Sequence, residues 1–280
     1  MKILFIRFSS IGDIVLTTSP LSSLKKGIPN AQIHYLTLEE YAPLLEGNSN
    51  IDRLHVLVRS ASVCKLISVG NYLNHCNFDI VVDMHDSLRS KIIRNRIKSG
   101  SHHYLKKPRW KRFKLFEFHQ NDFQNDFSQL TLFHSVIKDI LSQEHHSSTS
   151  LFVSENEKEE AKLLLSKNGI IGEQYLVCIP GAAWRNKTWE TANYLELFKY
   201  FMKNKFEIIL LGTEKDVICN DCALENNSLI NMAGKTEFRQ SLAIISQAQL
   251  VIGSDTGFVH AAEALGIPAV MLLGPTSTET

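Results

Sequence analysis

The sequence predicts an α/β protein built from two doubly wound, parallel-sheet domains in tandem. Short β-branched runs alternate with helix-length segments in both halves of the chain, a pattern typical of parallel sheets covered by helices on both faces. The length of 280 residues is enough for two compact domains. A polar stretch at 142–150 separates the two series and has too little apolar content for a core. We therefore expect it to be the linker between one domain at 1–146 and a second at 147–280.

The expected strands and helices alternate along each half. In the first half the strands are Ile3–Phe8, Gln32–Leu36, Arg53–Val58 and Ile80–Val82, and the helices lie near Asp13–Lys26, Ser62–His75 and Ser87–Lys98. In the second half the strands are Tyr175–Ile179, Glu207–Leu211, Leu229–Asn231, Leu250–Ile252 and Ala269–Leu273, and the helices lie near Trp189–Asn204, Lys215–Asn226, Phe238–Gln247 and Gly257–Leu265. Ligands of open α/β sheets bind at the carboxyl ends of strands, so two such domains facing each other would form a cleft there.

Several classes of protein are excluded by what the sequence lacks. Its apolar runs fall far short of the ~20 residues that cross a bilayer, and Arg7 interrupts the N-terminal run too early for a secretory signal, so we expect a cytosolic protein. Five cysteines at irregular positions make no disulfide framework, and Cys219 and Cys222 are expected to be inert helix residues. Motifs for dinucleotides, P-loops, serine nucleophiles and helical zinc sites are absent, and we expect no metal.

The loop after the first strand carries the first candidate site residues, Ser10, Gly12 and Asp13. Asp13 stands where a helix begins, and Asp favours the N-cap position because its carboxylate accepts hydrogen bonds from free backbone amides. The same carboxylate, at the carboxyl end of a strand, could accept a proton from an incoming hydroxyl as a general base. The two roles are compatible, and the residues alone leave both open.

A second loop, Pro180–Trp189, follows a strand of the second half. Small residues such as Gly181 allow a ligand to approach the backbone, and the nearby Arg185 and Lys187 suit a diphosphate. The alternative is that these are solvated loop charges, with Trp189 packing at the start of the helix.

A third loop, Gly253–His260, presents backbone amides at a helix N-terminus. The amides near Thr256 and Gly257 would form a ready anion site, because the first N–H groups of a helix lack partners and carry the positive end of its dipole. His260 lies one helical turn beyond Thr256, on the same face. A histidine without a functional role is the alternative.

Taken in this order, the three segments resemble glycosyltransferase family 9, the bacterial lipopolysaccharide heptosyltransferases, which have the GT-B fold of two facing Rossmann-like domains. The resemblance spans nearly the whole chain and rests on Ser9–Asp13, Lys187 with Trp189, Ser254–Gly257 with His260, Gly266, Pro268 and Gly274–Thr276. It implies transfer of heptose from ADP-heptose, a substrate rather than a cofactor, to the Kdo or heptose of the lipid A inner core. The transfer would invert the anomeric configuration and need no metal.

The resemblance also implies roles for individual residues. Asp13 matches the base that deprotonates the acceptor hydroxyl, and Lys187 matches the residue that neutralises the departing diphosphate. The donor pocket is expected to include Gly181, Arg185, Asp255, Thr256, Gly257 and His260. An acidic residue approaches the nucleoside, and either Glu214 or Asp216 fits that position; Glu214 is taken as the candidate.

Charge is spread unevenly along the chain. Residues 1–150 hold 19 basic and 13 acidic groups, whereas residues 151–280 hold 11 and 16. Residues 87–114 contain eleven Lys or Arg and no acid, and we name them the basic strip. It suits an anionic membrane surface or the acidic groups of a lipid A and Kdo acceptor, so the expected acceptor-binding residues are Ser10, Gly12, Lys107, Arg109, Lys111 and Arg112.

These expectations place the protein in the cytoplasm, attached peripherally to the cytoplasmic face of the inner membrane. Nucleic acid is not an expected partner, because no nucleic-acid-binding module accompanies the strip. Other members of the GT-B class, with a different donor or with epimerase activity, are the first alternative, and a non-catalytic protein that binds anionic lipid is the second. Family members continue beyond Thr276, so we expect the second domain to be truncated.

Overall fold

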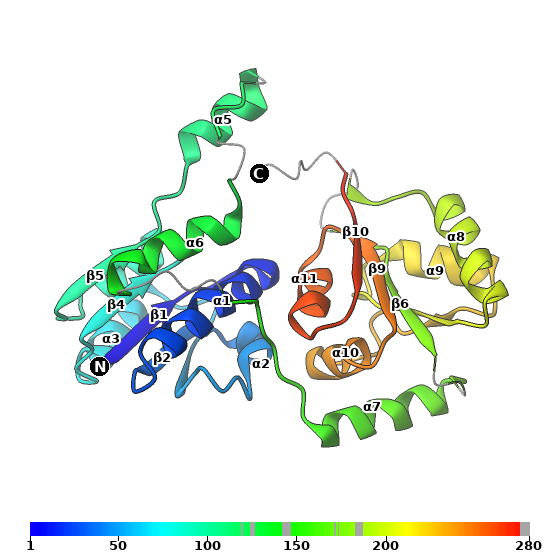
Figure 1. The fold of residues 1–280 in the computed structure, drawn as a ribbon, viewed down its shortest axis with the longest axis horizontal. Coiled ribbons are helices and arrows are strands. Elements are labelled where there is room, and N and C mark those ends of the chain that lie inside the picture. Colours follow the sequence, from blue (N-terminus) through cyan, green and yellow to red (C-terminus); the bar gives the residue numbers. More distant parts are fainter. Residues whose placement is uncertain are drawn as a thin grey trace. The chain divides into compact units, whose positions relative to one another are not determined.

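The computed structural model describes residues 1–118, 120–123, 127–141, 147–170, 172, 174–182 and 187–274, apart from the side chains of Arg112 and Phe116. The chain divides into two compact units: unit 1 covers residues 1–150 and unit 2 begins at Leu151 (Figure 1). Each unit contains one five-stranded sheet in which neighbouring strands are parallel. The predicted α/β class with two parallel sheets is therefore confirmed.

Unit 1 has the strand order β3-β2-β1-β4-β5. Its strands are β1 (Lys2–Ile6), β2 (Gln32–Leu38), β3 (Arg53–Leu57), β4 (Ile80–Asp83) and β5 (Ser101–Tyr104). Its helices are α1 (Ile11–Gly27), α2 (Ala42–Leu45), α3 (Val63–Asn74), α4 (Leu88–Arg94), α5 (Arg109–Phe118) and α6 (Gln129–Ile137), with 3-10 turns at Glu39–Tyr41 and Lys138–Ile140. The expected strands and helices are confirmed with shifted ends. β5, α2, α5 and α6 were not expected.

Unit 2 has the strand order β10-β9-β6-β7-β8. Its strands are β6 (Tyr175–Ile179), β7 (Glu207–Leu210), β8 (Ile230–Asn231), β9 (Leu250–Ser254) and β10 (Ala269–Leu272). Its helices are α7 (Glu155–Lys167), α8 (Thr191–Lys203), α9 (Val217–Glu225), α10 (Phe238–Ile245) and α11 (Gly257–Ala264). All the elements expected in this half are confirmed, and α7 is an addition to them.

The central strands β1 and β6 position the functional loops. Ile3–Ile6 in β1 and Leu176–Cys178 in β6 are fully buried, as expected for strands covered by helices on both faces. β1 lies between β2 and β4, and β6 lies between β7 and β9. Parallel neighbours end at the same edge of a sheet, so within each unit the loops that follow these strands lie close together.

The predicted linker at 142–150 differs from the structure in its described part. Residues 147–150 belong to unit 1 and hydrogen-bond to α1. The N–H of Ser147 donates to Ser23 Oγ at 3.1 Å, and the N–H of Ser150 donates to Thr18 Oγ1 at 2.9 Å. The hydroxyls of a serine- and threonine-rich helix therefore satisfy the backbone of a polar segment that composition alone assigns to solvent. Residues 142–146 lie outside the described residues.

Candidate functional site

Asp13 lies at the start of α1, directly after the loop that follows β1. The N-cap of α1 is Ser10, so the predicted N-cap role of Asp13 is wrong. Instead Asp13 is the third helical residue, and its Oδ2 accepts hydrogen bonds from the N–H of Ser10 at 3.2 Å and from the Ser10 hydroxyl at 3.0 Å. This is the capping-box arrangement, in which the side chain three residues into the helix reaches back to the cap.

A buried arginine fixes the Asp13 carboxylate. Arg7 Nη2 lies 2.5 Å from Asp13 Oδ2, and the two side chains are 6% and 29% exposed. Arg7 also donates from Nη1 to Met84 O at 2.5 Å and from Nε to Ser9 O at 2.6 Å, so one guanidinium ties the ends of β1 and β4 together. Asp13 Oδ1 accepts no hydrogen bond within the described part of the chain. The carboxylate therefore has a fixed orientation and one oxygen available to a ligand.

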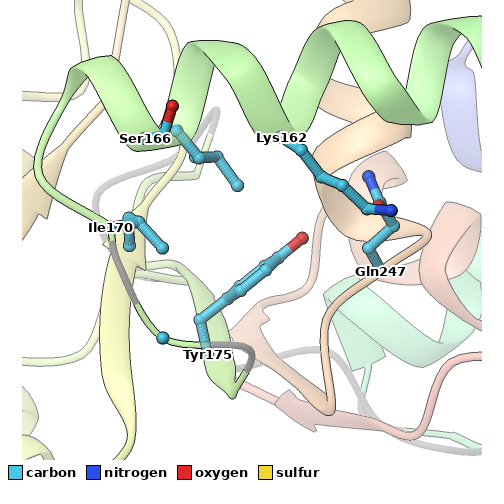
Figure 2. A pocket seen from close by; sticks show the side chains of 7 residues that line it. Lys162, Ser166, Ile170, Tyr175 and Gln247 are labelled. Atoms are coloured by element: carbon cyan, nitrogen blue, oxygen red, sulfur yellow. The ribbon is translucent and has the colours of Figure 1, made fainter.

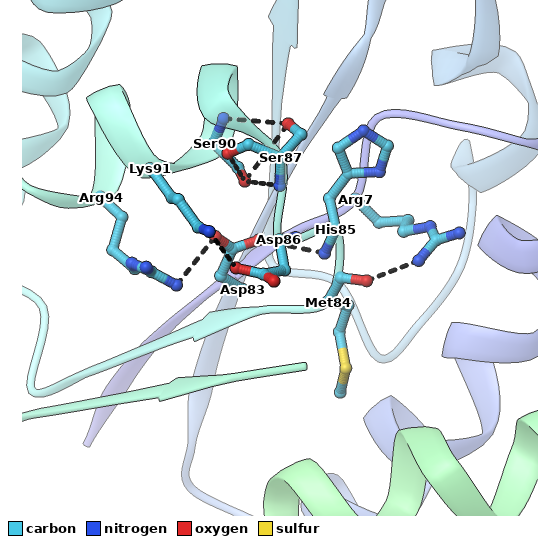
Figure 3. Close-up of polar contacts among 9 residues, drawn as sticks. All are labelled: Arg7, Asp83, Met84, His85, Asp86, Ser87, Ser90, Lys91 and Arg94. Carbon is cyan, nitrogen blue, oxygen red and sulfur yellow. Dashed lines mark hydrogen bonds and ion pairs between the residues drawn. The ribbon is translucent and has the colours of Figure 1, made fainter. Parts of the chain in front are cut away.

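The turn after β4 forms a second polar cluster at the same edge (Figure 3). Asp83, which ends β4 and is fully buried, accepts the N–H groups of His85 at 3.0 Å and Asp86 at 2.9 Å on Oδ1. Its Oδ2 pairs with Arg94 Nη1 at 3.1 Å, and Asp86 pairs with Lys91 Nζ at 3.2 Å. Sequence reasoning missed this cluster. A buried aspartate shapes the turn and sets the direction of His85.

The predicted acceptor residues are only partly brought together. Lys107 is half-buried, and burial lowers its pKa, as do the charges of Arg7 and Arg109, while Asp13 and Asp86 oppose that shift. Lys107 therefore shares the edge that carries Ser10, Gly12 and Asp13. Arg109 and Lys111 are exposed on α5, where Lys111 Nζ lies 5.8 Å from the centre of the Phe123 ring. The side chain of Arg112 lies outside the described residues.

In unit 2, three of the predicted donor residues meet after β6 and β9. Lys187 Nζ donates to Asp255 Oδ2 at 2.6 Å, and the side chains are 24% and 19% exposed. His260 Nε2 lies 3.9 Å from the other oxygen, Asp255 Oδ1. Each partner is partly open to solvent, so a cation, a carboxylate and an imidazole line one accessible surface.

The start of α11 lies beside this pair. Thr256 is the N-cap of α11, Gly257 is the first helical residue, and the buried Thr256 Oγ1 has no hydrogen-bond partner among the described residues. Ser254 Oγ donates to Pro180 O at 2.9 Å and lies 3.3 Å from the Tyr194 hydroxyl, which links the ends of β9 and β6. The start of α11 therefore presents its first backbone amides and the Thr256 hydroxyl beside the Lys187–Asp255 pair, the arrangement that anion sites at helix N-termini use.

A cavity of about 760 Å³ opens between the loops that follow β6 and β7, and its lining includes Gly181, Trp189, Lys215, Asp216 and Asp221. Asp216 Oδ2 accepts the N–H of Thr213 at 2.6 Å and its hydroxyl at 2.8 Å. A Cβ on Gly181 would lie 2.2 Å from Asp216 Oδ1, so Asp216 requires the glycine. Glu214 does not line this cavity. Arg185 lies outside the described residues.

A second cavity, of about 450 Å³, lies at the amino end of β6 and so away from the donor loops (Figure 2). Lys162, Ser166 and Ile170 line it together with Tyr175 and Gln247. The Tyr175 hydroxyl donates to Ile244 O at 2.7 Å, and burial raises its pKa. That hydroxyl serves the packing of β6 on α10.

The two cysteines of the C-x-x-C pair lie on α9, as expected. Cys219 and Cys222 are fully buried, and burial raises the pKa of the first to about 12 and of the second to about 11, which keeps both thiols protonated. Over the described ranges, no group of three or more His, Cys, Asp or Glu residues could hold a metal ion. Within the same ranges, no helix combines the length and the apolar character needed to cross a membrane.

A family model, curated relatives and several solved structures indicate one family. A family model described as glycosyltransferase family 9 (heptosyltransferase) matches residues 66–280. Lipopolysaccharide heptosyltransferase 3 of Escherichia coli is 25% identical over 280 residues, covering 95% of this chain and 81% of the relative. A family 9 glycosyltransferase structure from Veillonella parvula gives a TM-score of 0.84 at 21% identity, covering 99% of this chain and 82% of that one. E. coli ADP-heptose lipopolysaccharide heptosyltransferase II gives 0.81 at 21% identity, covering 100% and 86%.

Proposed function

Because the chain belongs to glycosyltransferase family 9, the heptosyltransferase family, we propose that it transfers heptose from ADP-heptose to the Kdo or heptose of the lipopolysaccharide inner core. The family and the GT-B fold expected from the sequence are confirmed, and the protein is a glycosyltransferase. The observation that carries the proposal is the Asp13 carboxylate, fixed by a buried arginine with one oxygen available. The Lys187–Asp255 pair beside the start of α11 supports the donor side.

Asp13 is the proposed general base. It takes the proton of the acceptor hydroxyl while that oxygen forms a bond to the anomeric carbon of the heptose. The bond from this carbon to the diphosphate breaks on the opposite side, and its electron pair leaves with ADP, so the configuration inverts. Because Arg7 and Ser10 both bind Oδ2, the proposal assigns the proton transfer to Oδ1. A base of this kind contributes roughly 10²–10⁴ in rate.

Lys187 and the start of α11 are the proposed diphosphate site. The leaving ADP gains negative charge as the bond breaks, so donors aimed at its phosphates act mainly in the transition state. Lys187 supplies a point charge, and the amides near Gly257 together with the Thr256 hydroxyl supply hydrogen bonds. Asp255 positions the Lys187 amine and is the carboxylate proposed to face the sugar. The proposed mechanism draws its positive charge from these groups and uses no metal.

The cavity of about 760 Å³ is the proposed place of the nucleoside. Its size is within the ordinary range of small-molecule sites. Of the two acidic residues that the sequence left open, Asp216 lines this cavity and Glu214 does not, so the proposal assigns Asp216 to the nucleoside.

Peripheral attachment to an anionic membrane surface is also proposed, because the acceptor is linked to lipid. Helix α5 extends away from the sheet of unit 1 (Figure 1) and exposes three aromatic side chains, with Trp110 66% exposed. Trp110 and Phe113 are stacked with ring centres 5.5 Å apart, and Phe113 and Phe118 meet edge to face at 5.8 Å. Exposed cations of the basic strip flank these rings, a combination that suits the headgroup region of anionic lipid.

The test is a transfer assay with ADP-heptose and a Kdo-terminated acceptor. Wild-type protein is expected to release ADP only when the acceptor is present. Asp13→Asn is expected to lose at least a hundredfold in kcat and to keep its thermal stabilisation by ADP-heptose. Asp139→Asn, an exposed carboxylate of the same unit, is the matched control. Unchanged turnover of Asp13→Asn would remove the proposed base.

A further inference from the structure

His85 lies at the same edge of the unit 1 sheet as Asp13, and the proposed function does not use it. The backbone N–H of His85 donates to the buried carboxylate of Asp83 at 3.0 Å. The His85 ring packs edge-on against the Phe8 ring, with ring centres 5.1 Å apart. Arg7 binds both Asp13 and the carbonyl of Met84, the residue before His85. One guanidinium therefore fixes both the backbone next to His85, as Figure 3 shows for the Arg7–Met84 bond, and the proposed base.

The environment of His85 leaves a single hydrogen-bond donor directed outward. Burial lowers its pKa to about 4, with further lowering by the charges of Arg7 and Lys107, so the ring is neutral at neutral pH. Its Nδ1 is buried and has no hydrogen-bond partner among the described residues. A buried N–H without a partner is costly, so the proton belongs on Nε2. That atom is not buried, and no described residue bonds to it.

The charge around His85 favours a negatively charged ligand. Arg7, Lys107 and Arg89 all act on the ring, and Asp13 is the acid that acts against them. Arg89 lies on the Phe8 ring, with its guanidinium 5.8 Å from the ring centre, and so stands beside His85. The other nearby acids, Asp86 and Asp83, are paired with Lys91 and Arg94. Cations therefore outnumber carboxylates around an unused donor.

We propose that His85, Lys107 and Arg89 form a subsite that binds an oxyanion of the acceptor sugar, a carboxylate or a phosphate, beside Asp13. The subsite rests on the proposed function, because it takes Asp13 as the base. His85 Nε2 donates a hydrogen bond to the oxyanion, and Lys107 and Arg89 balance its charge. Binding of the oxyanion at this subsite orients the acceptor hydroxyl toward Asp13 Oδ1. Sugars without a negative charge at this position are poor acceptors for the same reason.

Side-chain replacements that mimic one ring nitrogen at a time test the role of His85. Gln places an amide nitrogen near the position of Nε2, whereas Asn places one near Nδ1. We expect His85→Ala and His85→Asn to raise the acceptor KM about tenfold, the effect of one lost hydrogen bond to a charged group. His85→Gln is expected to restore most of this loss, and the KM for ADP-heptose is expected to stay unchanged in all three variants.

Direct binding to the full chain identifies the oxyanion and needs no donor. Free Kdo, its methyl ester and inorganic phosphate are titrated against wild type, His85→Ala and the exposed-histidine control His75→Ala. Binding of Kdo but not of its ester identifies a carboxylate, and binding of phosphate without binding of Kdo identifies a phosphate. The subsite is refuted if His85→Ala binds these anions as wild type does, or if Gln and Asn give equal acceptor KM values. Absence of heptose transfer by wild-type protein refutes the proposed function instead.

Discussion

At the carboxyl edge of β1 a carboxylate is anchored by a buried cation, whereas beside β6 a cation is anchored by a carboxylate. The two sheets have the same topology, β3-β2-β1-β4-β5 and β8-β7-β6-β9-β10, with the first strand of each unit at the centre. Arg7 is 6% exposed and binds Asp13 at 2.5 Å, while Lys187 is 24% exposed and binds Asp255 at 2.6 Å. The same sheet topology thus presents the Asp13 carboxylate in unit 1 and the Lys187 amine, paired with a carboxylate, in unit 2.

The cation of the unit 1 pair is more buried than that of the unit 2 pair, and this difference indicates a structural role for the first and a functional role for the second. Arg7 also donates to the backbone carbonyls of Ser9 and Met84, which follow β1 and β4, so its removal leaves the buried Met84 carbonyl without this donor. Lys187 pairs with Asp255 and stands partly in solvent, where an ion pair contributes little to stability. Arg7 is therefore part of the framework of unit 1, whereas Lys187 is available to a ligand.

The largest expected effects come from replacing each cation by methionine. Arg7→Met and Lys187→Met are each expected to lose about a hundredfold in kcat, the first through a displaced Asp13 and the second through lost stabilisation of the leaving diphosphate. Only Arg7→Met is expected to lose about 3 kcal/mol of unfolding free energy, because it breaks a buried pair. Urea unfolding and steady-state kinetics measure the two effects separately.

Arg59→Met provides the matched control, because Arg59 forms an exposed ion pair with Glu40. Its unfolding free energy is expected to change by less than about 1 kcal/mol. The contrast between the units is wrong if Lys187→Met destabilises the protein as much as Arg7→Met does.

The second largest expected effect is a difference between the two units in how their stability falls at acid pH. In unit 1, His34 Nδ1 and His55 Nε2 lie 2.9 Å apart in the core, and burial lowers the pKa of His34 and brings that of His55 to about 4. The unfolded chain therefore binds more protons below pH 6.5, so unit 1 loses stability as pH falls from 6.5 to about 4. In unit 2, a hydrogen bond from Arg239 lowers the pKa of Glu157 to about 2, so this contribution is lost only between about 4.5 and 2.

Amide hydrogen exchange, corrected for intrinsic rates, measures the protection of each unit separately at pH 7.5 and at pH 5.0. Unit 1 is expected to lose about 2 kcal/mol of protection through His55, because only the part of the shift between 6.5 and 5.0 is sampled, at about 1.4 kcal/mol per pKa unit, while unit 2 stays protected. His55→Leu should reduce the response of unit 1 but not abolish it, because the pKa of the partly buried His85 is also lowered to about 4, and the exposed His75→Ala should leave it intact. Equal loss in both units at pH 5.0 would contradict the assignment.

The sequence predicted the elements of each sheet better than the contacts of the site. Apolar runs identify buried strands reliably, but β5 reads Ser-His-His-Tyr, with no apolar pattern, and was missed. Helix α7 was missed although Ser154 and Glu157 form a capping box at its start, a signal readable from spacing. Arg7 could not be identified in the same way, because its burial depends on Met84, a residue 77 positions away. Long-range partners decide which charges are structural.

The smallest expected effect concerns the exposed aromatic rings of α5. Trp110→Ala with Phe113→Ala is expected to weaken binding to vesicles containing anionic phosphatidylglycerol about tenfold, because two rings no longer leave water. Transfer to a soluble acceptor fragment should be unaffected, since these rings lie outside the Asp13 cluster. Tyr200→Ala, an equally exposed aromatic of unit 2, is the control. Equal vesicle binding by all variants would show that the rings do not contribute and that the basic strip binds by charge alone. In that case raising the salt concentration would abolish binding in every variant.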